Sequence, residues 1–186
     1  MTLKVKQLII IEKECAMKFY PFVYTSSDEK IKIRISKATQ EDFLVTNKNP
    51  KWQSNWTKAV KEIGNKYAFK TPDGELIALG RYVNSDGAMY IHIAYIEAQA
   101  LSNPTIVANS EKKYKEIGRL LIAFGIKLSI DCGYGGDVAF EAKTDELAEY
   151  YIEKFHAMEL RRIQGEPRRF MLGGDEAWNI FKYYLQ

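Results

Sequence analysis

A short cationic stretch containing one glycine comes directly before a strongly apolar segment. The residues that carry this pattern are Lys112, Lys113, Lys115, Gly118 and Arg119. If a helix begins here, its first turn leaves several backbone N–H groups without an intrahelical partner, at the positive end of the helix dipole. Such a turn is a ready anion site, best suited to a phosphate or a pyrophosphate.

The segment after this turn is predicted to be an amphipathic helix. Its apolar side chains recur at helical spacing on one face, namely Ile117, Leu120, Leu121, Phe124 and Leu128. Gly133 stands where a left-handed helix cap is expected. The alternative is a helix that begins at Ser110 and runs straight through, with SEKKYKEIGRLL as its solvated start.

The stretch KYKEIGRLL resembles the acyl-CoA loop of the GNAT N-acetyltransferase superfamily, whose pattern is Arg/Gln-x-x-Gly-x-Gly/Ala. Lys113 stands at the first position, Glu116 where the first glycine is expected, and Gly118 at the second. The downstream order also resembles the signature half of the family: a helix, GYGGDVAFEA as a strand, and TDELAEYYIEKFHAM as the next helix. The resemblance covers the region 65–172 and implies acetyl-CoA as co-substrate, with no metal.

Glu116 departs from the family pattern. A glycine there lets the backbone approach a pyrophosphate closely, whereas glutamate adds bulk and negative charge. The phosphate prediction therefore requires the Glu116 side chain to point to solvent. The resemblance implies that CoA contacts Ile96, Ala98, Lys113, Tyr114, Lys115, Glu116, Ile117, Gly118 and Arg119.

The resemblance also implies two catalytic residues, because acetyl transfer to an amine needs a base for the amine and an acid for the thiolate. Glu97, at the end of the strand that feeds the loop, is the predicted base; a surface carboxylate is the alternative. Tyr151 is the predicted acid and resembles the tyrosine of the family's Tyr-x-x-x-Gly-Phe region. KFHAM replaces Gly-Phe here, so Tyr150 stays an alternative, as does a core tyrosine with a satisfied hydroxyl.

Length and composition favour one cytoplasmic domain. The 186 residues are long enough for a substantial core, and the apolar fraction of 46% excludes a disordered chain. A net charge of +3 is too balanced to predict nucleic-acid binding. Cys15 and Cys132 lie far apart in the sequence, and with the two histidines they form no metal-binding motif. In a cytoplasmic protein, both thiols are expected to be reduced. The apolar run Leu8–Ile11 is too short for a membrane span.

The N-terminal part, 1–64, is expected to hold strands and the acceptor-side helices. Residues 3–12 and 31–37 are predicted strands separated by the turn TSSDEK, the second with Ile31, Ile33 and Ile35 on a buried face. Thr39 is predicted to cap a short helix, Gln40–Val45. A second helix ends at Gly64, and the side chains on its shared face are Trp52, Trp56, Val60 and Ile63, as core or as a substrate wall.

A CoA-binding core is expected over residues 65–172. Segments 66–71, 75–84 and 88–98 are predicted to form an antiparallel meander with turns TPDG and NSDG. In its third strand, Ile91, Ile93 and Tyr95 are expected to share a face with Glu97, and His92 to lie opposite as a packed or hydrogen-bonded histidine.

The remaining elements complete a mixed α/β (α+β) domain. A loop over Leu101–Asn109, a strand at 137–142, a helix capped by Thr144 and a hairpin of 159–163 with 168–172 are predicted in turn. The apolar face of the capped helix holds Leu147, Ala148, Tyr151, Ile152 and Phe155. Asp175 is predicted to cap a last helix within 173–186, with Trp178, Phe181 and Leu185 on its apolar face. The sheet is expected to be largely antiparallel, with one central parallel β-α-β unit at 88–142.

The function that the resemblance implies is acetyl transfer from acetyl-CoA to a primary amine by direct attack. The alternative is a GNAT-like binding module for CoA or a protein ligand, in which Glu116 blocks productive cofactor placement. A nucleotide-binding protein is disfavoured, because the chain lacks a GxxxxGK[ST] loop and a dinucleotide fingerprint. The acceptor stays open among aminoglycoside, polyamine, peptide N-terminus and protein lysine; a homodimer is compatible, and no membrane or nucleic-acid partner is expected.

Overall fold

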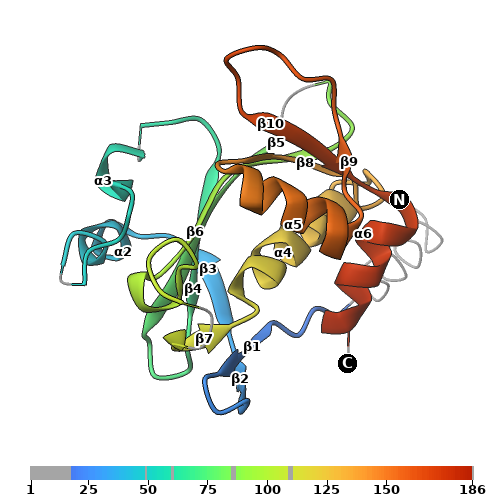
Figure 1. The fold of residues 1–186 in the computed structure, drawn as a ribbon. Helices are drawn as coiled ribbons and strands as arrows, with labels where there is room; N and C mark the ends of the chain where they lie inside the picture. Colours follow the sequence, from blue (N-terminus) through green and yellow to red (C-terminus); the bar gives the residue numbers. More distant parts are fainter. Residues whose placement is uncertain (1–17, 49, 60, 85–86, 109–110, 186) are drawn as a thin grey trace, which may run out of the picture.

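The computed structural model describes residues 18–48, 50–59, 61–84, 87–108 and 111–185 (Figure 1). The predicted strand at 3–12 and the centre of the NSDG turn lie outside the described residues. No described helix is both long enough and apolar enough to cross a membrane.

A seven-stranded mixed sheet forms the centre of the fold, in the order β3-β4-β5-β6-β8-β10-β9. Its strands are β3 (Arg34–Lys37), β4 (Asn65–Lys70), β5 (Leu76–Asn84), β6 (Ile91–Ala98), β8 (Val138–Ala142), β10 (Arg168–Leu172) and β9 (Met158–Glu159). All neighbours are antiparallel except β6 and β8, which pair in parallel. The predicted meander and the central β-α-β unit are therefore confirmed. The predicted hairpin is confirmed only in part, because its first strand is two residues long.

A second, small sheet holds β2 (Lys30–Lys32), β1 (Phe22–Thr25) and β7 (Tyr114–Lys115), in the order β2-β1-β7. The prediction of one strand over 31–37 is wrong, because the chain changes sheets at Ile33. The N–H of Ile33 donates to Pro21 O at 2.8 Å, and its side chain is buried. An alternating apolar pattern does not reveal such a change, since both halves keep the same period.

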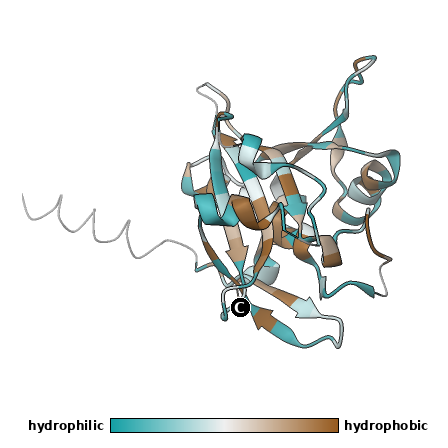
Figure 2. Ribbon diagram, turned by 90° about the vertical axis from the view of Figure 1, so that its left-hand side faces the viewer, coloured by the Kyte–Doolittle hydropathy of each residue, from teal (hydrophilic) through white to brown (hydrophobic). Residues whose placement is uncertain are grey.

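The two faces of the large sheet are covered by different helices (Figure 1). One face holds α4 (Ile117–Asp131), α5 (Asp145–Phe155) and α6 (Gly174–Phe181), followed by the short helix η3 (Lys182–Tyr184). The other face holds α2 (Gln40–Val45) and α3 (Trp56–Ala59), and Phe43, Trp52 and Trp56 pack there against Leu76 and Leu79. In Figure 2 the apolar segments gather in the central strands and helices.

Helix α4 is buried on more sides than one apolar face predicts. Ile122, Ala123 and Ile126 are buried together with the predicted face, of which only Leu128 is half-buried. Gly125 permits this close approach, since a Cβ there would lie 2.7 Å from Ile93 Cδ1. Gly133 follows the helix with a φ of 80°, as predicted for a left-handed cap.

Helix starts were predicted correctly where a side chain caps them. Thr39 forms a capping box with Asp42, and Thr144 accepts the N–H of Leu147. The Asp175 prediction is wrong, because α6 begins at Gly174 and has no side-chain cap. On this helix Phe181 is buried, whereas 43% of Trp178 is exposed.

The helix predicted to end at Gly64 is much shorter than expected. Among the described residues of this segment, the helix covers Trp56–Ala59 alone, and Ile63 is 83% exposed. The backbone N–H groups of Gln53 and Ser54 instead donate to the Glu97 carboxylate at 2.7 and 3.2 Å. This tertiary contact replaces the first helical turn, and local sequence patterns do not encode it.

Candidate functional site

The large sheet opens between its two parallel strands. β6 pairs with β8 only over Ile91–Ile93, opposite Val138–Phe140. Beyond Ile93, β6 continues to pair with β5, whereas β8 continues to pair with β10. The opening thus lies at the carboxyl ends of the parallel pair, where ligands commonly bind in α/β sheets.

A β-bulge at Ala94 marks the start of this opening. Tyr82 pairs with Ile93 and Arg81 with Tyr95, which leaves Ala94 without a partner on β5. One extra residue reverses the alternation of side chains. The prediction that Tyr95 and Glu97 share a face with Ile91 and Ile93 is therefore wrong.

The bulge divides the side chains of β6 into two groups. Ile91 and Ile93 pack in the core beside α4, whereas Tyr95 and Glu97 face Trp56 on the opposite side. Alternation before the bulge puts His92 on the Trp56 side as well. Three groups capable of acid–base chemistry thus share one face of β6: Tyr95 and Glu97 at the opening, and His92 just before it.

The backbone of Ile96 and Ala98 faces the opening. The N–H of Gln99 donates to Ile77 O on β5 at 2.8 Å. Because backbone groups alternate in direction along a strand, those of Ile96 and Ala98 point away from β5, toward the edge that β8 has left. Both residues were predicted to contact the cofactor, and their backbone can offer hydrogen bonds to an extended ligand.

The predicted phosphate turn lies between β7 and α4. Tyr114 and Lys115 form a strand, and α4 begins at Ile117, so the alternative of one continuous helix from Ser110 is wrong. The first helical N–H bond runs from Leu120 to Glu116 O at 3.0 Å. No described side chain caps this helix start, so the three preceding N–H groups are available to an anion.

Gly118 leaves open space in front of this helix start. A Cβ added to Gly118 would meet no atom within 4 Å, and the residue is exposed. Free N–H donors and an exposed glycine together suit the close approach of a phosphate.

The backbone of Glu116 explains why a glycine is expected at its position. Its φ of 67° lies in the left-handed region, which glycine adopts without steric strain. The side chain is exposed, as the phosphate prediction requires, and Oε2 lies 3.3 Å from Arg119 Nη1. A negative charge therefore stands at the edge of the turn.

Three cations of the turn, Lys113, Lys115 and Arg119, are paired with carboxylates. Lys113 Nζ lies 2.7 Å from Glu75 Oε1, and Lys115 Nζ lies 2.7 Å from Asp28 Oδ1. The Tyr114 hydroxyl also donates to Glu75, at 2.8 Å; burial and this carboxylate raise the pKa of Tyr114. The anion-binding capacity of the turn consequently depends on backbone N–H groups more than on lysine side chains.

Glu97 is buried, with 4% of its surface exposed, so the alternative of a surface carboxylate is wrong. Besides the N–H groups of Gln53 and Ser54 on Oε1, the indole of Trp56 donates to Oε2 at 2.8 Å. A carboxylate offers about four lone-pair sites, so little acceptor capacity is left. Glu97 fixes the segment 53–56 against the sheet.

The two tyrosines of α5 differ in exposure. Tyr151 is 5% exposed, and its ring lies 4.8 Å from that of Phe140 and 5.8 Å from that of Phe170. Burial raises the pKa of Tyr151. Tyr150 is 42% exposed, and burial followed by the charge of Glu116 raises its pKa.

A polar cluster that the sequence did not reveal spans the opening. Lys143, directly after β8, reaches across to β6, where its Nζ donates to the Tyr95 hydroxyl and lies 3.8 Å from the ring centroid. The same hydroxyl bonds Ser54 Oγ, and Trp56 packs edge-on against Tyr95 at 5.2 Å. These residues are distant in sequence, and only the bulge at Ala94 turns Tyr95 toward the others.

His92 is half-buried beside the opening. Burial lowers its pKa, an effect that Arg81 increases and Glu141 opposes. The imidazole is therefore neutral near pH 7 and can accept a proton.

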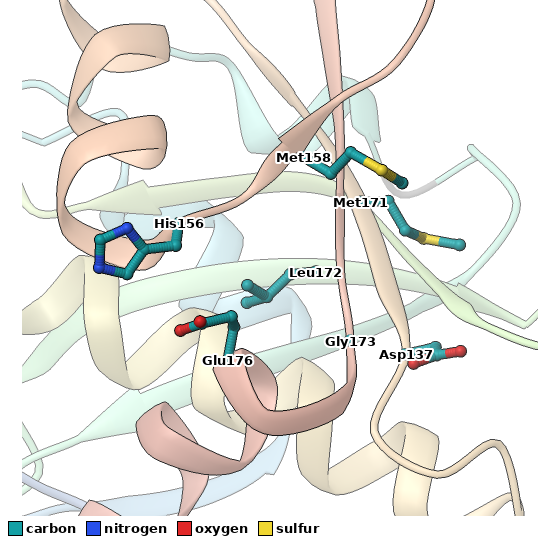
Figure 3. A pocket seen from close by; sticks show the side chains of 7 residues that line it. All are labelled: Asp137, His156, Met158, Met171, Leu172, Gly173 and Glu176. Atoms are coloured by element: carbon teal, nitrogen blue, oxygen red, sulfur yellow. The ribbon is translucent and has the colours of Figure 1, made fainter.

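A separate cavity of about 380 Å³ lies at the other end of β8 (Figure 3). Its lining residues are Asp137, His156, Met158, Met171, Leu172, Gly173 and Glu176. In Figure 3, His156 and Glu176 stand on one side of it and Asp137 on the other. No group of metal-binding side chains occurs among the described residues.

Comparison with known proteins rests on the structure. No family model matches the sequence, and no curated protein matches it. A spermidine N-acetyltransferase from Vibrio cholerae, in complex with CoA and spermine, is 12% identical, with a TM-score of 0.51 over 79% of this chain and 98% of that chain. A GNAT-family acetyltransferase from Staphylococcus aureus is 11% identical, with a TM-score of 0.50 over 75% and 98%.

A third similar structure is a chimera based on the Vibrio cholerae spermidine N-acetyltransferase, 11% identical, with a TM-score of 0.52 over 79% of this chain and 99% of that chain. At identities of 11–12%, the three structures show a likeness in fold alone. The chain has the fold of the GNAT N-acetyltransferase superfamily.

Proposed function

We propose that this chain is an acyl-CoA-dependent N-acetyltransferase that transfers acetyl from acetyl-CoA to a primary amine by direct attack. The observation that carries the proposal is the opening between β6 and β8 beside the uncapped start of α4. CoA combines a pyrophosphate with a long, extended arm. The helix start suits the pyrophosphate, and the free edge of β6 suits the arm.

The cofactor contacts follow from this geometry. We infer that the pyrophosphate lies on the backbone of 113–119, and that the arm bonds the backbone of Ile96 and Ala98. A structure of the same fold contains CoA, which supports this choice of co-substrate. In this proposal, residues 65–172 form the CoA-binding core, 1–64 the acceptor side and 173–186 a C-terminal helix that covers α4.

The reaction needs a base, for which the chain offers two candidates. Glu97 is the base that the sequence predicts, acting directly or through a water on the remaining acceptor site of Oε2. His92 is a second candidate, because it shares the face of Glu97 and its lowered pKa leaves it neutral at pH 7. Attack by the neutral amine on the thioester carbon then expels the thiolate, and the backbone donors of β6 stabilise the oxyanion.

A screen of acetyl transfer from acetyl-CoA across an amine panel tests the function. The panel holds a polyamine, an aminoglycoside, a peptide with a free N-terminus and a lysine peptide. We expect one class to give acetylated product together with free thiol. CoA binding without transfer to any amine would favour the alternative of a binding module.

A further inference from the structure

We propose that Tyr95, held by Lys143 and Ser54, is the proton donor to the thiolate leaving group. This inference rests on the proposed function, because it names a residue for the same reaction. It replaces the predicted donor on α5 with a phenol from β6 that stands at the opening itself.

The end of α5 argues against a donor on that helix. In the pattern Tyr-x-x-x-Gly-Phe, the glycine stands four residues after the tyrosine. The left-handed residue that ends α5 is His156, with a φ of 50°, a conformation that glycine usually supplies. Four residues before His156 stands Ile152, which has no proton to give.

Neither Tyr150 nor Tyr151, the two residues before Ile152, takes over the role of proton donor. The ring of Tyr151 packs against Phe140, Phe155 and Phe170 in the core on the α4 side of the sheet. Tyr95 lies on the opposite side. The charges that act on the pKa of Tyr150 are those of Glu116 and Arg119 at the phosphate turn.

Tyr95 meets the geometric requirements of a donor. It is the first residue after the bulge, where β6 parts from β8, and its side chain is half-exposed. Lys143 reaches it from the end of β8, so the hydroxyl stands between the two edges of the opening. Ser54 and the ring of Trp56 fix its orientation from the α3 side.

The cation beside the hydroxyl suits this role. A phenolate formed at Tyr95 would be stabilised by the Lys143 ammonium, which already donates to the same oxygen. As the C–N bond forms and the C–S bond breaks, the thiolate takes the Tyr95 proton. The proton that the amine gives up to the base returns through water to the phenolate, so the products are the amide and the free thiol.

The test measures kcat and KM of a Tyr95→Phe variant with acetyl-CoA and the acceptor found in the panel. The ring and its contact with Trp56 remain, so we expect an intact fold and an unchanged KM for acetyl-CoA. We expect kcat to fall by roughly 10²–10⁴-fold, the range for general acid–base catalysis.

Matched variants separate this role from a structural one. Tyr150→Phe and Tyr151→Phe should keep the wild-type kcat. Lys143 is exposed, so Lys143→Met should fold normally and lower kcat, and Lys143→Arg should restore part of the rate. A wild-type kcat in Tyr95→Phe would overturn the assignment. So would a roughly 10²–10⁴-fold loss of kcat in Tyr151→Phe when Tyr95→Phe keeps the wild-type kcat. A wild-type protein that binds no acetyl-CoA and acetylates no amine would instead refute the proposed function, and this inference with it.

Discussion

The two oxygens of Glu97 receive three N–H donors, so this carboxylate holds structure together whatever else it does. A catalytic base must also be able to gain a proton. His92 on the same face carries no comparable set of donors, and its pKa is lowered by burial. Substitution of each residue therefore separates positioning from proton transfer.

In a Glu97→Gln variant, the amide NH₂ would face N–H donors of Gln53, Ser54 or Trp56. We expect stability to fall by about 1–3 kcal/mol, because a buried donor loses its acceptor. If Glu97 is the base, the rate falls roughly 10²–10⁴-fold and recovers at high pH, where the amine arrives neutral. A loss that is independent of pH would assign Glu97 to positioning alone.

His92→Gln is the matched comparison. If His92 is the base, wild-type kcat/KM should decline only below about pH 6.5, because burial holds the folded pKa below the ordinary value. In His92→Gln, most of the rate should be lost, and the remaining kcat/KM should no longer decline at acid pH. An unchanged profile would leave the base role to Glu97.

Glu116 combines a left-handed backbone with a charge at the phosphate turn. A Glu116→Gly variant removes both the steric strain and the repulsion of an anion. We expect tighter binding of CoA by calorimetry and a folding stability that rises by up to about 1 kcal/mol. A Glu116→Gln control removes the charge alone, so equal affinity in the two variants would identify charge as the cause. Weaker binding in Glu116→Gly would mean that the Glu116–Arg119 pair assists the ligand.

At the scale of elements, Arg168 joins α5 to the β9–β10 hairpin. Its guanidinium contacts Glu159 through two bonds of 2.9 and 2.7 Å and reaches Glu149 at 2.8 Å. Arg168 first, and Arg162 second, lower the pKa of Glu159 to about 2. An unfolded glutamate titrates near pH ~4.3, so the ionised pair stabilises the fold above that pH.

This depressed pKa predicts an acid-sensitive hairpin. The stabilisation from Glu159 is fully present above pH ~4.3 and is lost as the pH falls toward about 2. Urea unfolding of Arg168→Met should show lower stability than wild type at pH 7, and the difference should shrink below pH ~4. Arg162→Met, whose side chain is 65% exposed, is the control and should change less. A difference that stays constant with pH would assign the effect of Arg168 to packing.

At the scale of the whole molecule, local signals predicted the elements that depend on neighbouring residues. The caps at Thr39 and Thr144, the α4 helix with Gly133 after it and the β-α-β order are all of this kind. Their determinants lie within a few residues of one another, so a single sequence is sufficient to identify them.

Features that depend on distant partners were missed. The bulge at Ala94 requires a β5 register that no local pattern specifies, and it decides where Tyr95 and Glu97 point. Similarly, the segment before Trp56 is not helical because Gln53 and Ser54 donate to Glu97, which lies 44 and 43 residues away in the chain. The orientation of the β6 side chains was therefore not predicted, and the site at β6 and the turn before α4 stays a prediction.

In the proposed function, the uncapped start of α4 beside the open sheet holds the pyrophosphate of CoA. The most direct measurement is a calorimetric titration of acetyl-CoA into the wild-type protein and a Gly118→Val variant, with thermal unfolding of each. We expect saturable binding by wild type, with stabilisation of about 2.7 kcal/mol at 100 times Kd. The variant should fold but not bind, because its side chain fills the open space before the helix. Gly118→Ala, with a smaller side chain, should bind with intermediate affinity. Equal affinity in wild type and a folded Gly118→Val, or no binding by wild type, would contradict the account.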